Sequence, residues 1–358
     1  MSSNLNALQT FDSVSGDVVL ITGATGHIGF IVLQLALKAG YSVRAAVRSQ
    51  EKADSLSSSP LIKALEPASR LSFVIVPDLS APSAYDEAAQ GAKYVIHLAS
   101  PIPMKGYTAP EDCERVFVIP AIKGTLEMLE AAKRSGTVQR VVITSSVIAL
   151  MTFKDFSQGG NAATFTADSR VPTPPNLYSG DFEAYAASKV AALNESEAWM
   201  ARETLAFDLV NIMPSFVFGR NNLVTDVKDV VSGSNSALLS FLLGNKAESP
   251  LGGHSVHVDD VARTHLLALN PNVGGNQSFV TSAQTPNGMV WEDAFKFVAV
   301  HFPAAVAGGT LPCNGSQPTY DQKVDSSKTE EVFGFKHQSY EEQVKSAVGH
   351  YLELAAKA

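Results

Sequence analysis

The sequence has little cysteine, a modest share of charged residues and no long apolar run. Its two cysteines, Cys113 and Cys313, are far apart and match neither a disulfide framework nor a zinc-binding spacing. The net charge is −8 and the basic residues are scattered, so the basic patch typical of nucleic-acid binding is missing. No apolar run reaches the roughly 20 residues that cross a membrane. We expect no metal, no nucleic-acid partner and no membrane partner.

The first residues also lack the features of a targeting signal. Residues 1–17 contain Asp12 and Asp17 but no lysine or arginine, whereas secretory and mitochondrial signals are basic. Together with the low cysteine content, this favours a cytoplasmic location. We expect residues 1–16 to form a short flexible tail.

Apolar residues make up 45% of the 358 positions, enough for a substantial core in one large or two ordinary domains. Short β-branched runs alternate with helical patterns as far as residue 213. Strands are expected at residues 18–22, 42–47, 71–77, 94–99, 140–145 and 207–213. Helices are expected at residues 28–37, 116–132 and 182–203. This alternation predicts an α/β fold with a Rossmann-type, doubly wound parallel sheet.

The other segments are less regular and are expected to form a smaller, mostly C-terminal substrate lobe. The pattern fails over residues 150–181 and 219–255, where only 237–243 looks helical. Later elements are expected as helices at 256–269, 290–301 and 340–354 and a strand near 278–281. We therefore expect a discontinuous dinucleotide-binding domain of residues 17–149, 182–216 and 256–272. The lobe would comprise residues 150–181, 217–255 and 273–358.

A glycine-rich loop follows the first expected strand. Gly23, Gly26 and Gly29 are spaced by three, directly before the first helix, and a second strand follows within about thirty residues. Such glycines allow a tight turn, close approach to a pyrophosphate and close helix packing, while the helix start attracts anionic charge. The alternative is an ordinary strand-to-helix turn that binds nothing. The context favours a bound dinucleotide.

The end of the second strand distinguishes between cofactors. NAD-type sites usually carry an acidic residue there, whereas this chain has Arg48, with Lys52 one helical turn further on. Both can pair with a 2′-phosphate, which favours NADP(H) over NAD(H). The alternative is that both are merely solvated charges.

Two further polar residues lie near the expected ligand crevice. Asp78 follows the third strand, where its carboxylate either accepts from an adenine amino group or only caps the next turn. His97 lies inside the fourth strand, and we interpret it as a core residue with a hydrogen-bond partner rather than a catalyst.

Tyr185 and Lys189 are four residues apart in an expected helix, so their side chains share one face. A fixed ammonium beside a phenol is expected to lower the phenol pKa and prepare it for proton transfer to a carbonyl oxygen. The fifth strand ends in Thr144, Ser145 and Ser146, where one serine hydroxyl could hold the substrate carbonyl. Spacing alone does not choose between Ser145 and Ser146, because adjacent strand residues face opposite ways.

These motifs together resemble the extended short-chain dehydrogenase/reductases. The segments at residues 46–53, 77–79 and 140–146, and Pro214 followed by residues 217–219, resemble the NADPH-dependent aldehyde and ketone reductases grouped with dihydroflavonol reductases. The resemblance covers nearly the whole chain from about residue 17. Residues 150–181 and 219–255 match least well.

The resemblance implies roles for individual residues. It makes Ser146 the catalytic serine, Tyr185 the proton donor and Lys189 the residue that tunes Tyr185. Residues implied to contact the cofactor are Gly23, Thr25, Gly26, His27, Ile28, Gly29, Arg48, Lys52, Asp78, Leu79, Ala99, Ser100, Tyr185, Lys189, Pro214, Ser215 and Val217. Residues implied to line the substrate pocket are Ile102, Val147, Met151 and Phe218.

The preferred hypothesis is therefore an NADPH-dependent reductase of a small-molecule ketone or aldehyde, acting as a monomer or homodimer. A sugar-nucleotide epimerase or dehydratase of the same superfamily is an alternative. Dehydratases usually place an acidic pair after strand five, whereas the apolar run of residues 147–151 follows Ser146 here. A non-catalytic NADP(H) sensor is a third hypothesis, although such proteins tend to lack the Tyr/Lys pair.

Overall fold

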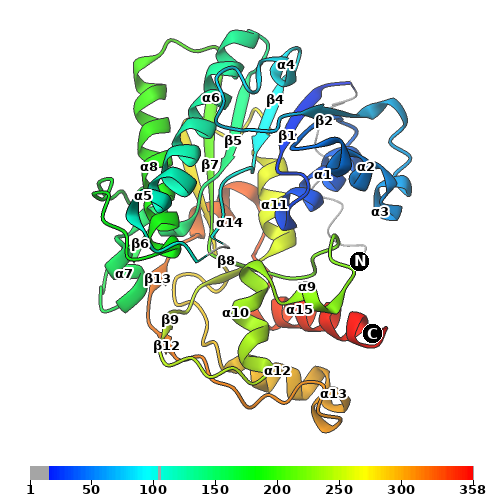
Figure 1. The fold of residues 1–358 in the computed structure, drawn as a ribbon, viewed down its shortest axis with the longest axis vertical. Coiled ribbons are helices and arrows are strands. Elements are labelled where there is room, and N and C mark those ends of the chain that lie inside the picture. Colours follow the sequence, from blue (N-terminus) through cyan, green and yellow to red (C-terminus); the bar gives the residue numbers. More distant parts are fainter. Residues whose placement is uncertain (1–15, 104–105, 358) are drawn as a thin grey trace. The chain divides into compact units, whose positions relative to one another are not determined.

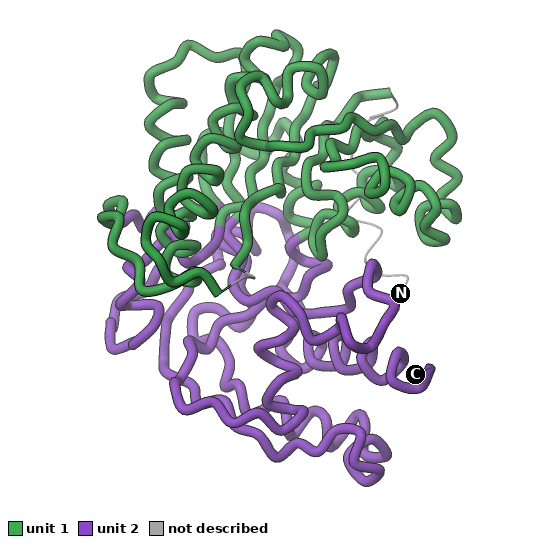
Figure 2. Tube along the Cα trace, in the orientation of Figure 1, with its two compact units in different colours: residues 1–145, 172–212, 262–278 green, residues 146–171, 213–261, 279–358 purple. Residues whose placement is uncertain are grey.

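The computed structural model describes residues 16–103 and 106–357 of the chain. The expected flexible tail falls almost entirely on residues 1–15, outside the described residues. The chain forms two compact units, shown in different colours in Figure 2. Unit 1 comprises residues 1–145, 172–212 and 262–278, and unit 2 comprises residues 146–171, 213–261 and 279–358. That one unit binds the dinucleotide and the other the substrate stays a prediction.

A seven-stranded sheet, in the order β11-β7-β5-β4-β1-β2-β3, organises the fold (Figure 1). Its strands are β1 (Val18–Thr22), β2 (Ser42–Val47), β3 (Leu71–Ile75), β4 (Tyr94–His97), β5 (Arg140–Thr144), β7 (Asp208–Pro214) and β11 (Gln277–Thr281). The pairs from β3 to β7 are parallel, with Val19 opposite both Val43 and Tyr94. The predicted α/β fold with a parallel sheet is confirmed. The strand expected in the substrate lobe near residue 278 is in fact the edge strand β11.

Helices connect these strands in unit 1. They are α1 (His27–Lys38), α2 (Gln50–Ser58), α3 (Pro60–Lys63), α4 (Asp86–Ala89), α5 (Pro110–Cys113), α6 (Ile119–Ser135) and α8 (Asp181–Arg202), with a 3₁₀ turn at Ala68–Arg70 and a π-helical turn at Glu114–Val118. Helices α6 and α8 lie side by side (Figure 1). The expected helix at 116–132 therefore starts as a π-helical turn. The helix expected from residue 256 is α11 (Val258–Leu267), because Val256 and His257 pair as a strand instead.

The core of unit 1 lies between the sheet and its helices. Leu20, Val95 and Val141 from the strands are fully buried against Met128 and Leu129 of α6. These strands are buried almost without interruption, as expected for parallel strands covered on both faces.

A buried arginine ties three segments of unit 1 together. The Arg140 guanidinium forms two bonds to Asp208, at 2.6 and 2.8 Å, and donates to the carbonyl oxygens of Ala268, Asn270 and Val273. The Asp208 carboxylate balances the positive charge of Arg140, and the three carbonyl oxygens accept further hydrogen bonds from the guanidinium. A buried ion pair is stable when its remaining donors are satisfied in this way.

Unit 2 consists mostly of short elements. They are a 3₁₀ turn (Val147–Leu150), α7 (Phe153–Gln158), β6 (Thr164–Phe165), β8 (Phe216–Phe218), α9 (Val227–Val230), α10 (Gly233–Leu242), β9 (Leu251–Gly252), β10 (Ser255–His257), α12 (Asp293–His301), α13 (Pro303–Ala307), β12 (Thr319–Tyr320), β13 (Lys323–Val324), α14 (Ser327–Phe333) and α15 (Tyr340–Ala355). Its core surrounds Trp291, whose indole N–H donates to the Gly252 carbonyl at 3.1 Å. The segment 150–181, expected to be irregular, holds α7, which a Thr152–Asp155 capping box begins.

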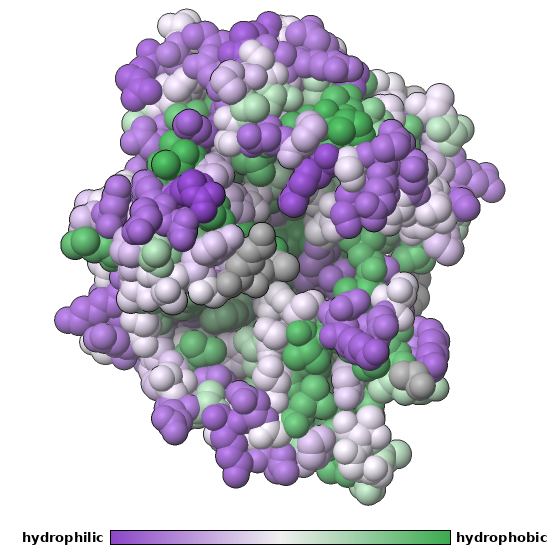
Figure 3. All heavy atoms as spheres, viewed as in Figure 1, coloured by the Kyte–Doolittle hydropathy of each residue, from purple (hydrophilic) through white to green (hydrophobic). Residues whose placement is uncertain are grey.

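On the face shown in Figure 3, hydrophilic side chains are interspersed with apolar ones, some of which form small patches. Among the described residues, Leu177 is 77% exposed and Ile102 is 58% exposed. No helix in the described ranges combines the length and apolar content needed to cross a membrane.

Candidate active site

The glycine loop forms a tight turn between β1 and α1 in unit 1. Gly23 has a φ of 72°, and a Cβ there would lie 2.9 Å from the Ala99 nitrogen. Gly26 donates its N–H to the Gly23 carbonyl at 2.9 Å and precedes the first residue of α1. A Cβ on Gly29 would come within 2.1 Å of that same carbonyl oxygen. Two of the three positions therefore exclude any side chain, and among the described residues no side-chain hydrogen bond caps the amino end of α1 at Gly26.

This loop lies where the strand order reverses, between β1 and β4. In open α/β sheets, ligands bind at the carboxyl ends of the strands at that point. The Thr22 hydroxyl accepts from the backbone N–H groups of Leu98 (3.1 Å) and Ala99 (3.0 Å) and contacts His97 Nδ1 at 3.0 Å. Thr22, which sequence reasoning missed, thus joins the ends of both strands.

His97 is a core residue, as predicted. It is 3% exposed, and burial lowers its pKa to about 3, so it carries no charge at neutral pH. Its ring packs edge-on against Tyr85 at 5.6 Å between centroids.

Arg48 and Lys52 lie at the start of α2 with their side chains exposed. The Ser49 hydroxyl caps this helix by accepting from the Lys52 N–H at 3.4 Å. In the described parts of the chain, no ion pair uses Arg48 or Lys52. Both cations are therefore available to an anionic ligand.

Asp78 caps a turn in this structure. Its carboxylate accepts from the hydroxyl and the N–H of Ser80, at 2.7 and 2.8 Å, and these bonds lower the pKa of Asp78. Leu79 packs on α6, where a Cβ at Gly124 would meet Leu79 Cδ1 at 2.1 Å. A contact of either residue with adenine stays a prediction.

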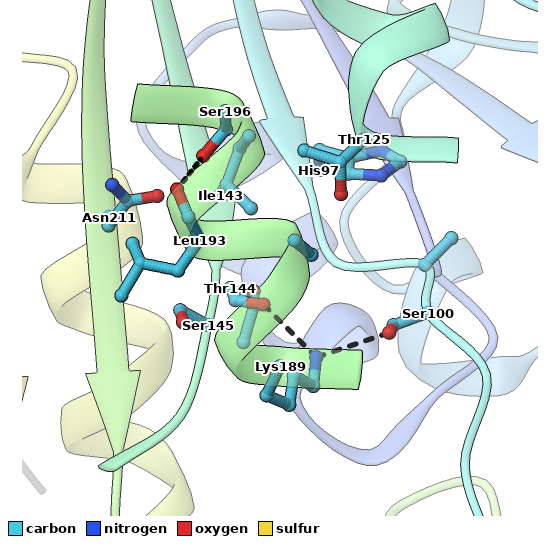
Figure 4. A pocket seen from close by; sticks show the side chains of 12 residues that line it. His97, Ser100, Thr125, Ile143, Thr144, Ser145, Lys189, Leu193, Ser196 and Asn211 are labelled. Carbon is cyan, nitrogen blue, oxygen red and sulfur yellow. Dashed lines mark hydrogen bonds between the residues drawn. The ribbon is translucent and has the colours of Figure 1, made fainter. Parts of the chain in front are cut away.

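Tyr185 and Lys189 lie on adjacent turns of α8, and the Lys189 Nζ is 5.7 Å from the Tyr185 ring centroid. Lys189 is 7% exposed, whereas Tyr185 is half-buried. Figure 4 shows the Lys189 ammonium donating to the Ser100 hydroxyl at 3.1 Å and to the Thr144 carbonyl at 3.4 Å. Tyr185 and Lys189 therefore lie close together, as expected, and the structure adds Ser100 as a hydrogen-bond partner of Lys189.

The charges of this pair differ from the prediction. Burial lowers the pKa of Lys189 to about 8 and raises the pKa of Tyr185 to about 12. The expected lowering of the tyrosine pKa is wrong here, because desolvation of the phenolate outweighs the ammonium 5.7 Å from the ring. Tyr185 is thus a neutral phenol at physiological pH, with its proton in place.

Beside Lys189 lies a small cavity of about 20 Å³ (Figure 4). Its walls include the side chains of Ser100, Thr125, Ser145 and Asn211. This volume holds about one water molecule and is too small for a carbonyl substrate. Thr125 and Asn211 were not identified from sequence. Asn211 interrupts the apolar run of residues 209–213, which is a signal that could have drawn attention to it.

The two candidate serines belong to different parts of the fold. Ser145 lines the cavity beside Lys189 and donates its N–H to the Ile212 carbonyl at 2.8 Å. Ser146 is the first residue of unit 2, where its hydroxyl accepts from the Ile148 N–H at 3.3 Å and caps the following 3₁₀ turn. The grouping of Ser146 with Tyr185 and Lys189 stays a prediction.

The remaining predicted site residues lie mostly in unit 2. Pro214 ends β7, Ser215 donates its hydroxyl and its N–H to the Thr281 carbonyl, both at 3.1 Å, and Val217 lies buried in β8. Their contact with the nicotinamide half of a cofactor stays a prediction.

The expected substrate-lining residues differ in exposure. Ile102, in unit 1, is 58% exposed and available to a ligand. Val147 and Met151 are buried, and Phe218 is fully buried in the core of unit 2, edge-on to Trp291 at 5.6 Å. Phe218, expected in a pocket wall, packs in the core of unit 2, and its part in a substrate pocket stays a prediction. The neighbouring Phe216, two residues earlier on that strand, is only half-buried.

Comparison with known proteins identifies relatives along nearly the whole chain. The model of the NAD dependent epimerase/dehydratase family matches residues 19–280. Ketoreductase CTB6 of Cercospora beticola is 44% identical over 351 residues, which cover 96% of this chain and 97% of the relative. The NAD-dependent epimerase/dehydratase ALT6 of Alternaria alternata is 36% identical, covering 94% of this chain and 98% of the relative.

A solved structure agrees with the fold. Yeast methylglyoxal/isovaleraldehyde reductase Gre2, complexed with NADPH, superposes with a TM-score of 0.78 at 26% identity and covers 95% of this chain and 100% of that chain. The expected resemblance to extended reductases is confirmed by these similarities. The matched family model and the ketoreductase relatives place this chain in the NAD dependent epimerase/dehydratase family.

Proposed function

We propose that this protein is an NADPH-dependent oxidoreductase that reduces the carbonyl group of a small-molecule ketone or aldehyde to an alcohol. The observation that carries the proposal is that unit 1 holds both a glycine loop and the Tyr185–Lys189 pair on α8. Relatives named as ketoreductase and as aldehyde reductase with NADPH support the same reaction.

The residues of unit 1 fit NADPH. Gly23 and Gly29 leave no room for side chains, so the backbone can approach the pyrophosphate, and the amino end of α1 favours its charge. Arg48 and Lys52 are exposed and would hold the 2′-phosphate. NADPH supplies the hydride that reduces the carbonyl carbon.

Tyr185 supplies the matching proton in this proposal. As the carbonyl carbon gains hydride, its oxygen becomes an alkoxide, which is a stronger base than a phenolate. Proton transfer from Tyr185 is therefore favourable even with its pKa raised to about 12. The raised pKa keeps the proton on Tyr185 until the alkoxide forms.

Lys189 keeps a positive charge beside the phenol. Ser100 and the Thr144 carbonyl fix the ammonium, so it stabilises the phenolate left after proton transfer. Ser146 is assigned to hold the carbonyl oxygen through its hydroxyl, and Ser145 is the alternative.

An epimerase or dehydratase activity is the second candidate, supported by the 36% identical relative from Alternaria alternata, which is named an epimerase/dehydratase. The buried apolar turn of residues 147–150, where dehydratases usually carry an acidic pair, favours simple reduction. A sensor without catalysis is disfavoured by the retained Tyr185–Lys189 pair.

The test is loss of NADPH absorbance with a panel of aryl ketones, ketoesters and aldehydes. We expect turnover of at least one class, and Ser146→Ala should lower kcat by about a hundredfold, as for the loss of one oxyanion donor. Ser145→Ala is the matched control and should retain most of the activity. A larger loss in Ser145→Ala would transfer the role to Ser145. No turnover with any member of the panel, but turnover of a nucleotide sugar, would favour the second candidate.

A further inference from the structure

We propose that His265 is a positioning residue for Lys189 and that it acts through Thr144. The inference rests on the proposed function of Lys189, and it assigns a role to a helix, α11, that carries none of the predicted site residues. The three residues belong to unit 1.

Two contacts form the connection. The Thr144 hydroxyl and His265 Nε2 are 2.7 Å apart, while the carbonyl oxygen of the same threonine accepts from the Lys189 ammonium at 3.4 Å. His265 is fully buried, so this hydrogen bond has no competition from solvent. Residues 121 positions apart in the sequence thus meet at the end of β5.

Thr144 needs this support because the sheet holds it on one side only. The ladder between β4 and β5 ends at the pair His97 and Ile143, one residue before Thr144. On the other side, Thr144 is still opposite Ile212 of β7. His265 therefore fixes the last residue of β5, whose carbonyl orients the ammonium.

The surroundings of Lys189 make its charge sensitive to this carbonyl. The titratable groups facing it are Tyr185 on its own helix and His97 from β4, which is neutral at physiological pH. No carboxylate lines the described cavity wall beside Lys189. The Lys189 ammonium thus donates to the Ser100 hydroxyl and to the Thr144 carbonyl.

Displacing the Thr144 carbonyl should therefore disfavour the charged form of Lys189. We expect His265→Leu to lower the pKa of Lys189 by at least about half a pH unit. The alkaline limb of the kcat profile should move to lower pH by the same amount. His265→Gln, whose amide reaches the position of Nε2, should restore both values.

Lysine labelled with ¹³C at Cε reports the Lys189 pKa by NMR without turnover, with Lys189→Met used to assign the signal. This readout separates the two proposals, since it needs no substrate. Thr144→Val removes the hydroxyl while keeping the carbonyl, and should give the same shift if His265→Leu does not fold. Thr144→Ser should behave as the wild type.

His337→Leu is the control for general destabilisation, because His337 is also a buried histidine bonded to a side chain, Glu330 at 3.2 Å, in unit 2. It should lower the melting temperature without moving the Lys189 pKa. A Lys189 pKa that is unchanged in Thr144→Val or in folded His265→Leu, or that shifts equally in His337→Leu, would overturn the inference. If the Lys189 pKa changes in these variants as predicted but the wild type reduces no carbonyl compound, the result would count against the proposed function and not against this inference.

Discussion

Replacing Lys189 by methionine tests the electrostatics of the site through protein stability. Methionine fills a similar volume without a charge, so the variant removes the cost of burying the ammonium. The pKa of Lys189 falls from 10.5 to about 8 on folding, which corresponds to about 3 kcal/mol of destabilisation at neutral pH. Loss of the bonds to Ser100 and Thr144 opposes this gain by about 1 kcal/mol each.

The sign of the pH dependence follows from proton linkage. Below about pH 8, lysine is charged in both states and folding carries the full cost. Above that pH, the folded protein releases a proton that the unfolded chain keeps up to its pKa of 10.5. The wild type therefore gains stability relative to Lys189→Met as the pH rises, and about 2 kcal/mol should be recovered by about pH 9.5.

Urea denaturation of both proteins at neutral pH and at about pH 9.5 measures this difference. We expect Lys189→Met to be about 1 kcal/mol more stable at neutral pH and less stable than the wild type at the higher pH. Activity should be lost at both. A stability difference that does not change with pH would refute the claim that Lys189 is a desolvated cation.

Other predictions concern the cofactor. Arg48→Asp should shift the ratio of kcat/KM values from NADPH toward NADH by about tenfold to a hundredfold, since it replaces a charge-assisted bond by repulsion. Steady-state assays with both cofactors measure this ratio. A variant that still prefers NADPH would show that the 2′-phosphate is bound elsewhere. Gly29→Ala puts a Cβ 2.1 Å from the Gly23 carbonyl and should weaken NADPH binding by more than about tenfold in a fluorescence titration. Gly349→Ala is the control, because a Cβ there makes an ordinary 3.8 Å contact with Phe302 and should leave NADPH binding unchanged. Unchanged NADPH binding by Gly29→Ala would show that the glycine loop accommodates the added methyl group.

Much of the fold could be predicted because its signals are local. Most sheet strands are short, largely apolar runs, and the glycine spacing marks the turn that precedes α1. Elements without a repeating pattern were missed. Helix α7 has only six residues, and β6 has two, so neither shows a period.

The candidate site could be predicted in part. Tyr185 and Lys189 are neighbours on one helix, so their spacing alone brings them together. Thr144 and His265 meet only through the tertiary fold, and no spacing connects residues 121 positions apart. The direction of the Tyr185 pKa was wrong for a related reason, because desolvation depends on what covers the side chain, and the sequence does not record that.

The central claim is that a nucleotide held by unit 1 delivers hydride while Tyr185 delivers the proton. Tyr185→Phe tests it most directly, with NADPH affinity from fluorescence and the hydride-transfer rate from single-turnover absorbance. Tyr178→Phe is the control, since it removes a phenol hydroxyl bonded to Glu114 in the same unit and should keep most of the activity. We expect Tyr185→Phe to bind NADPH like the wild type and to transfer hydride at least about a hundredfold more slowly. An unchanged hydride-transfer rate in that variant would contradict the account.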